Sequence, residues 1–286
     1  MILSFILMAL AVIGSVCLYI FTPLVEQPYW IWVPFILVPI FFVLGFGLVI
    51  AFAFILSLFI RPSGYVYKNK QNKFFNWILM QASFLLVHLG NASIKYSGLE
   101  KIPSDKKYLF VSNHLSNFDP IVYFALKPHE KIICIIKTGI YKIPIASAFS
   151  YESGYIPINR KDPKEAMSTV IACKEAVEAN RVSVLVYPEG TRAKDFVLKD
   201  FHPSTFKIAL MSKCPVVVTS IQNSYMIAKN FPFKHTTVYF DVLGVIYPEK
   251  YENMSAYELS KYAHDLIEEH LNAHKDRMVY PKEKKK

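Results

Sequence analysis

Charge is nearly absent from the first 60 residues of this 286-residue chain, where Glu26 is the single charged side chain. The whole chain is 53% hydrophobic and has a mean hydropathy of +0.28, which excludes an ordinary soluble domain over its full length. Each uncharged run, 1–25 and 27–60, is long enough to cross about 30 Å of hydrocarbon, which takes roughly 20 helical residues. We therefore expect residues 1–60 to form two transmembrane helices, with one span and a re-entrant or interfacial segment as the alternative.

Basic residues are also missing before the first run, so a cleaved signal peptide is the weaker interpretation of it. Arg61, Lys68, Lys70 and Lys73 follow the second run closely. Because basic loops tend to stay in the cytoplasm, this pattern predicts an integral membrane protein with its large domain on the cytoplasmic face. Tyr29, Trp30 and Trp32 are typical of an interfacial aromatic belt.

The chain has few cysteines and no C-x-x-C pattern or Cys/His cluster. This favours reduced thiols in a cytosolic domain, and we expect no metal site. A G-x-S-x-G elbow is missing as well, which argues against the usual serine hydrolase. The net charge of +10 suits either nucleic acid or anionic lipid, and the apolar runs favour an anionic membrane surface over nucleic acid.

Beyond residue 60 the pattern divides into three parts. Residues 61–92 are interpreted as a basic linker and an interfacial membrane helix over 74–91, with a third span or a core helix of the following domain as alternatives. Residues 93–280 are expected to form one domain. Residues 281–286 form a basic tail.

Short apolar runs alternate with helical patterns over residues 93–280. The helices are expected to begin at Asp119-Pro120, at Asp162-Pro163 and at a capping box that starts at Ser255. The strands are expected at Ser93–Tyr96, Tyr108–Val111, Lys131–Ile136, Gly154–Ile158, Ser183–Tyr187, Val216–Ser220 and Thr236–Leu243. This alternation predicts an α/β domain with a mostly parallel mixed sheet of about seven strands flanked by helices.

A histidine and an aspartate follow the second predicted strand at the spacing N-H-x-x-x-x-D. A carboxylate from Asp119 that reaches one ring nitrogen of His114 would fix its tautomer and leave the other nitrogen free to take a proton from a hydroxyl. Ligand sites of open α/β sheets lie at the carboxyl ends of strands, where this pair is expected. The plain alternative is a helix cap beside a loop histidine.

Arginine follows two later strands. The first run, G-x-x-x-I-x-R, begins at Gly154 and ends at Arg160, whose guanidinium could bind a phosphate or form a surface ion pair. The second run is Y-P-E-G-T-R, with Glu189, Gly190, Thr191 and Arg192. Its glycine permits a tight turn or a close ligand, whereas an ordinary turn with an Arg–Glu ion pair remains the alternative.

These three motifs, in this order over Ser97 to Ser220, resemble the glycerolipid acyltransferase family, in particular the 1-acylglycerol-3-phosphate acyltransferases. Lys137 resembles a family lysine that lies near the substrate phosphate. The resemblance implies that 93–280 is a catalytic domain with no cofactor. It implies transfer of an acyl group from acyl-CoA or acyl carrier protein to the sn-2 hydroxyl of 1-acylglycerol 3-phosphate, which gives phosphatidic acid in phospholipid biosynthesis.

The same resemblance implies the roles of the site residues. His114 would be the general base and Asp119 its partner, while a second group of residues binds the substrate. That substrate-binding group is Lys137, Gly154, Arg160, Glu189, Gly190, Thr191 and Arg192. The alternatives are another lysophospholipid or glycerol 3-phosphate as acceptor, a hydrolase that uses water, and a membrane scaffold without activity.

Overall fold

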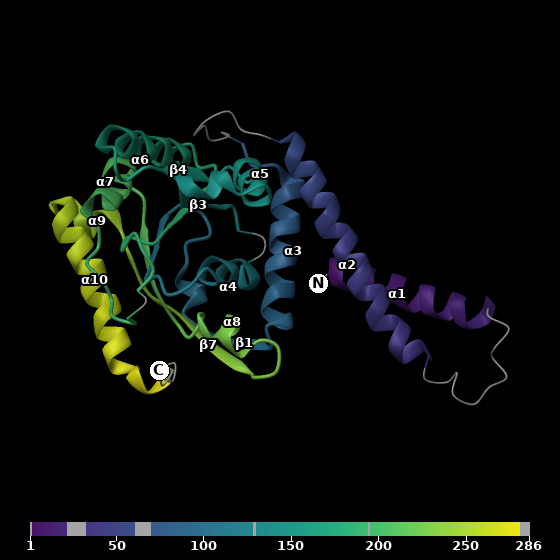
Figure 1. The fold of residues 1–286 in the computed structure, drawn as a ribbon. Helices are drawn as coiled ribbons and strands as arrows, with labels where there is room; N and C mark the ends of the chain where they lie inside the picture. Colours follow the sequence, from purple (N-terminus) through teal and green to yellow (C-terminus); the bar gives the residue numbers. More distant parts are fainter. Residues whose placement is uncertain (1, 22–32, 61–69, 128–129, 194, 281–286) are drawn as a thin grey trace.

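The computed structural model describes residues 2–21, 33–60, 70–127, 130–193 and 195–280 (Figure 1). Its centre is a seven-stranded sheet in the order β1-β7-β6-β2-β5-β3-β4. All neighbouring strands are parallel except β6 and β7. The strands are β1 Ala92–Ser97, β2 Leu109–Ser112, β3 Ile132–Lys137, β4 Ile156–Ile158, β5 Ser183–Val186, β6 Val216–Gln222 and β7 Thr236–Ile246. The mostly parallel seven-stranded sheet predicted from the sequence is therefore confirmed.

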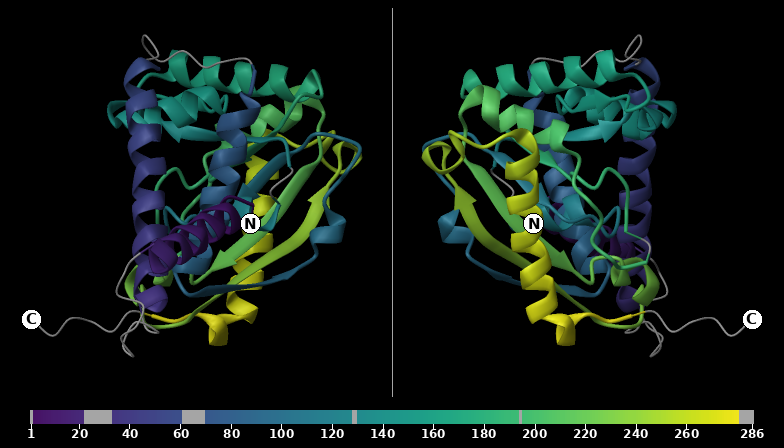
Figure 2. Two further views of the ribbon diagram at one scale, coloured as in Figure 1. Left: turned by 90° about the vertical axis from the view of Figure 1, so that its right-hand side faces the viewer. Right: turned by 90° about the vertical axis from the view of Figure 1, so that its left-hand side faces the viewer.

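Helices cover both faces of the sheet. In Figure 1 the sheet lies between α10 on one side and α3 and α4 on the other, and Figure 2 shows α10 crossing in front of the strands. The α-helices of this domain are α4 Asp119–Leu126, α5 Pro144–Glu152, α6 Pro163–Glu178, α7 Lys207–Ser212, α8 Met226–Asn230, α9 Pro248–Tyr251 and α10 Ala256–Ala273. Short 3-10 turns occupy Leu99–Lys101, Thr138–Lys142, Pro203–Phe206 and Lys275–Arg277.

The core forms where the sequence is continuously apolar. Strands β2, β5 and β6 are buried along their whole length, as expected for strands with helices on both faces. Two predicted helix starts are also confirmed. The Asp162 side chain accepts from the first turn of α6, and Ser255 and Glu258 form the capping box of α10.

The antiparallel pair of this mixed sheet is formed by β6 and β7. Strand β7 extends beyond the predicted Leu243 to Ile246, with a register shift at Val218/Thr219. Helices α7, α8 and α9 were not expected from the sequence. Neither was helix α5, which precedes β4. It begins at Pro144 and ends where Gly154 turns the chain with φ of +73°.

The two apolar N-terminal runs form α1 Ile2–Phe21 and α2 Val33–Phe59, which pack against each other. Both expose large apolar side chains, such as Ile13 at 57% and Leu48 at 71%. Over the described part of the chain, we find no helix both long enough and apolar enough to cross a membrane. The two transmembrane spans therefore stay a prediction. The aromatic belt at Tyr29, Trp30 and Trp32, the linker 61–69 and the tail 281–286 lie outside the described residues.

Helix α3 Lys73–Leu89 falls on the predicted interfacial segment 74–91 and has two different faces. One face packs against α4 and α5 and places Met80 in the main core. The other face exposes apolar side chains, with Phe74 at 50% and Leu89 at 43%. The helix is thus joined to the α/β domain, and its position at a membrane interface stays a prediction.

Candidate active site

The site forms at the carboxyl ends of five adjacent parallel strands. In the order β6-β2-β5-β3-β4, each strand is parallel to the next, so the segments that follow them meet at one edge of the sheet. His114 follows β2, the Glu189 turn follows β5, and Lys137 ends β3. Arg160 follows β4, where Lys137 pairs in register with Ile158. The topology therefore gathers motifs that are far apart in the sequence.

The predicted His114–Asp119 pair is present in the structure. His114 Nδ1 lies 2.7 Å from Asp119 Oδ2, and the same oxygen accepts from the backbone N–H of Leu115 at 2.7 Å and of Ser116 at 2.9 Å. The Asp119 side chain is fully buried, whereas the His114 side chain keeps 19% of its surface. Asp119 is the first residue of α4, and the cap position is Phe118, so the interpretation of Asp119 as the helix cap is wrong. Its carboxylate bonds back to the loop instead.

These contacts decide which ring nitrogen of His114 carries the proton in the neutral imidazole. Because Asp119 Oδ2 already accepts two backbone N–H groups, it acts as an acceptor, and His114 Nδ1 is the donor. The lone pair of His114 is therefore on Nε2. The second carboxylate oxygen, Oδ1, accepts from the hydroxyl of Ser224, a fully buried residue that follows β6. Four hydrogen bonds thus fix the position of this buried carboxylate.

The rest of His114 is held as firmly as its Nδ1 atom. Its backbone N–H donates to Glu189 Oε1 at 2.6 Å, and its backbone carbonyl accepts from Ala193 at 2.8 Å. The Tyr187 ring stacks on the imidazole, with the ring centroids 4.2 Å apart and the planes 18° from parallel. A base that is fixed on so many sides needs little reorganisation before it accepts a proton.

Glu189 is a buried carboxyl group that joins the loop after β2 to the loop after β5. Its Oε1 accepts from His114 and its Oε2 from the backbone N–H of Lys199 at 3.2 Å. Burial raises the pKa of Glu189 to about 7, although both backbone hydrogen bonds act to lower it. The Glu189 carboxylate thus holds the backbone of His114 and of Lys199.

Arg160 reaches across to the Glu189 turn. Its guanidinium donates to the carbonyl of Gly190, a backbone acceptor inside the third motif. Gly190 has φ of +73°, and a Cβ atom there would lie 2.5 Å from Arg160 Nη1 and 2.9 Å from His202 Nε2. Glycine is therefore required at this position for the arginine to approach the turn.

The remaining predicted site residues differ in burial. Lys137, the last residue of β3, is exposed, as are Thr191 and Arg192 in the loop that follows β5. Gly154 is buried at the end of α5, and its N–H donates to the Tyr151 carbonyl at 3.0 Å. Gly154 thus forms part of the turn between α5 and β4.

Two contacts of the site were missed by the sequence reasoning. Tyr187 is the first residue of the third motif, two positions before Glu189, so the motif itself could have indicated that Tyr187 belongs to the site. Ser224 lies outside the three motifs, and its contact with Asp119 joins residues 105 positions apart. No short-range pattern could have found it.

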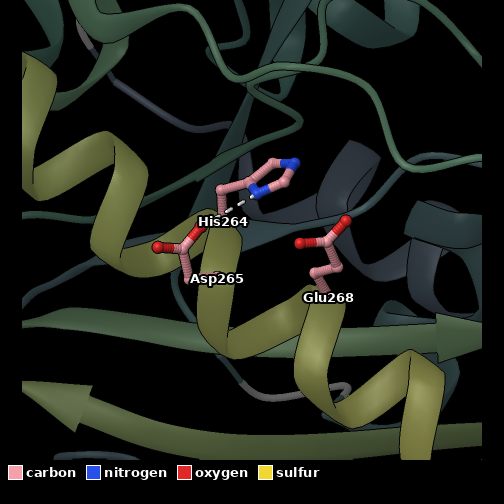
Figure 3. A group of neighbouring side chains, drawn as sticks. All are labelled: His264, Asp265 and Glu268. Atoms are coloured by element: carbon pink, nitrogen blue, oxygen red, sulfur yellow. Dashed lines mark hydrogen bonds and ion pairs between the residues drawn. The ribbon is translucent and has the colours of Figure 1, made fainter.

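A further group of polar side chains lies on α10. His264, Asp265 and Glu268 place their ligand atoms within 4.8 Å of one another (Figure 3). Asp265 already pairs with Lys261 at 3.1 Å, and this ion pair lowers the pKa of Asp265. Both carboxylates are exposed, as is usual for solvated charges on a helix surface. We assign no metal to this group.

The fold and the site together define an α/β protein whose histidine–aspartate pair can take a proton from a bound hydroxyl. Residues 93–222 match the family model described as Acyltransferase. This match covers all three sequence motifs, and together with the named relatives it confirms the resemblance to the glycerolipid acyltransferases of the PlsC type.

Named relatives agree with this assignment. The chloroplastic 1-acyl-sn-glycerol-3-phosphate acyltransferase BAT2 of Brassica napus is 36% identical over 128 residues, which are 44% of this chain and 36% of that protein. The chloroplastic enzyme LPAT1 of Arabidopsis thaliana is 30% identical over 65% of this chain and 51% of its own length. The chain thus spans about a third to a half of these two relatives.

A solved structure has the same fold. The 1-acyl-sn-glycerophosphate acyltransferase PlsC of Thermotoga maritima superposes with a TM-score of 0.56 at 20% sequence identity. The superposition covers 80% of this chain and 98% of the other. The likeness therefore includes nearly all of that protein, and at this identity it describes the fold.

Proposed function

We propose that this protein transfers a fatty acyl group from an acyl thioester to the sn-2 hydroxyl of 1-acylglycerol 3-phosphate, giving phosphatidic acid. The observation that carries the proposal is the His114–Asp119 pair, with its fixed tautomer and its Nε2 lone pair at the carboxyl edge of the sheet. The two plant relatives, both named 1-acyl-sn-glycerol-3-phosphate acyltransferases, support the choice of acceptor.

In the proposed reaction, His114 Nε2 takes the proton of the acceptor hydroxyl as its oxygen attacks the thioester carbon. The tetrahedral intermediate then collapses, the carbon–sulfur bond breaks, and the imidazolium returns the proton to the leaving thiolate. Asp119 stabilises the imidazolium between these steps. General base catalysis of this kind contributes roughly 10²–10⁴-fold. The acceptor hydroxyl takes the place that a serine occupies in a hydrolase.

The acceptor phosphate is proposed to bind at the strand ends beside His114. Arg160, Arg192 and Lys137 are exposed cations at the ends of β4, β5 and β3. Arginine suits this role because its planar guanidinium can bind two phosphate oxygens at once. Binding here would orient the hydroxyl toward Nε2, and orientation can supply a large part of the rate enhancement.

The proposal also includes the surroundings of the reaction. Acyl-CoA or acyl carrier protein would supply the acyl group, without a cofactor, as a step of phospholipid biosynthesis. The exposed apolar side chains of α1 and α2 support a membrane location for these helices. The basic residues after α2 favour the cytoplasmic face for the catalytic domain.

A substrate panel tests the proposal. The full chain in detergent would be assayed with 1-acylglycerol 3-phosphate, lysophosphatidylcholine and glycerol 3-phosphate, each against acyl-CoA and acyl carrier protein. We expect turnover with 1-acylglycerol 3-phosphate to exceed turnover with lysophosphatidylcholine, whose headgroup is zwitterionic, and with glycerol 3-phosphate, which has no acyl chain. Equal or faster turnover with another acceptor would contradict the proposed substrate, and free fatty acid as the main product would indicate a hydrolase.

A further inference from the structure

Two aromatic rings stand in solvent at the turn between α8 and β7. Phe233 is 90% exposed and Phe231 is 57% exposed. Apolar side chains this large are costly to leave in water, and side chains that gather in one place mark an interaction surface. The turn lies beyond residues 93–222, so it is outside the match to the family model.

The turn is held in shape by hydrogen bonds at both ends. The Phe231 N–H donates to the Ile227 carbonyl at 3.1 Å, and the Lys234 N–H donates to the Asn230 carbonyl at 2.9 Å. The Asn230 side chain also donates to Thr236 Oγ1 at 2.9 Å. These hydrogen bonds therefore fix the backbone that carries the two phenylalanine rings.

The turn adjoins the end of α3, which also exposes apolar side chains. Leu86 and Leu89 are 39% and 43% exposed. The Thr236 N–H donates to the Asn91 carbonyl at 3.0 Å, and His235 lies 3.2 Å from the Asn91 side chain. Figure 1 shows this turn beside the lower end of α3, on the side of the molecule that carries α1 and α2. We call Leu86, Leu89, Phe231 and Phe233 the aromatic edge.

The charge around the aromatic edge has one sign. Residues 73–99 and 221–240 contain no aspartate or glutamate. Lys229 precedes the turn and Lys234 follows Phe233 directly. Apolar rings flanked by lysines, without nearby acids in these two segments, match the composition of a surface that meets anionic lipid headgroups.

We propose that the aromatic edge inserts into the interface of an anionic lipid bilayer and is a second membrane contact besides α1 and α2. Helix α8 has five residues, about 7.5 Å of axial rise, and joins the turn to Ser224 on the catalytic carboxylate. Insertion would therefore bring the acceptor lipid and the His114 site to the same edge. The inference rests on the proposed membrane location but not on the acyl-transfer reaction.

A dye at position 233 tests the insertion without requiring turnover. Of the four cysteines, Cys17 is exposed and the other three are buried, so Cys17→Ser leaves Phe233→Cys as the site for an environment-sensitive dye. The matched control is Tyr257→Cys, because Tyr257 is 65% exposed on α10, on the opposite side of the sheet. Each labelled full chain would be reconstituted into vesicles of phosphatidylcholine with or without phosphatidylglycerol.

We expect a blue shift and quenching by spin-labelled lipid for the dye at 233, larger with phosphatidylglycerol, and neither effect at 257. Lys229→Glu with Lys234→Glu should reduce the shift at 233. Emission at 233 equal to that at 257 in both vesicles would overturn the inference. A shift that appears only when acyl carrier protein is added would indicate a protein partner and would also overturn the inference. A shift that depends on the protein density in the vesicles and not on the lipid would indicate self-association and would overturn it as well. Loss of acyl transfer with the shift retained would count against the proposed function alone.

Discussion

Glu189→Gln tests the energetics of the buried carboxyl group behind His114. Glu189 is 4% exposed, and burial raises its pKa from 4.5 to about 7. Between these two pH values the unfolded chain has released the proton while the folded chain still holds it. Stability therefore falls as the pH rises through this window, and the difference of about 2.5 pH units corresponds to about 3 kcal/mol. Glutamine does not titrate, so the variant should lose this part of the pH dependence.

The measurement is the unfolding free energy of the full chain in detergent between pH 4.5 and 8, compared with the variant. The gap between the two curves should change by about 3 kcal/mol, with the wild type relatively more stable at the acid end. Glu258→Gln is the control, because hydrogen bonds from Ser255 lower the pKa of Glu258, so this group titrates below the measured range and its variant should run parallel to the wild type. Parallel curves for wild type and Glu189→Gln would refute the reasoning.

Three further substitutions test the site. Ser224→Ala removes a charge-assisted hydrogen bond to Asp119 that is worth about 1.5–3 kcal/mol, so kcat should fall about 10–100-fold. Ser220→Ala is the control and should leave kcat unchanged, because the buried Ser220 hydroxyl has no partner among the described residues. Arg160→Ala should raise the KM for a phosphorylated acceptor about 10–100-fold and that for the acyl donor much less; equal changes would count against phosphate binding. Gly190→Ala should reproduce the Arg160→Ala pattern by displacing the guanidinium, while Gly244→Ala, with open space around its Cβ, should not.

Most of the sheet could be predicted because the signal is local. A strand that helices cover on both faces must be apolar throughout, so runs such as Val184-Leu185-Val186 identify it directly. The parallel order of the strands then predicts that His114, Glu189 and Arg160 lie at one edge. The antiparallel β7 and helix α5 have no comparable pattern, because pairing direction depends on contacts between distant segments.

The details of the site were less accessible for the same reason. Asp119 before a proline has the local pattern of a helix cap, yet its carboxylate turns back to Leu115 and Ser116 because the preceding loop presents their N–H groups. The bond from Ser224 depends on β6 lying next to β2. The sequence motifs could thus predict the candidate site residues. The contacts that hold these residues in place could be identified only from the three-dimensional structure.

The central claim is that His114 takes the proton of the acceptor hydroxyl. The most direct measurement is acyl transfer to 1-acylglycerol 3-phosphate by His114→Ala, with His264→Ala on α10 as the matched histidine control. We expect His114→Ala to lose roughly 10²–10⁴-fold in kcat while its unfolding transition and membrane association stay those of the wild type, and His264→Ala to keep full activity. Turnover by folded His114→Ala within a few-fold of the wild type would contradict the account.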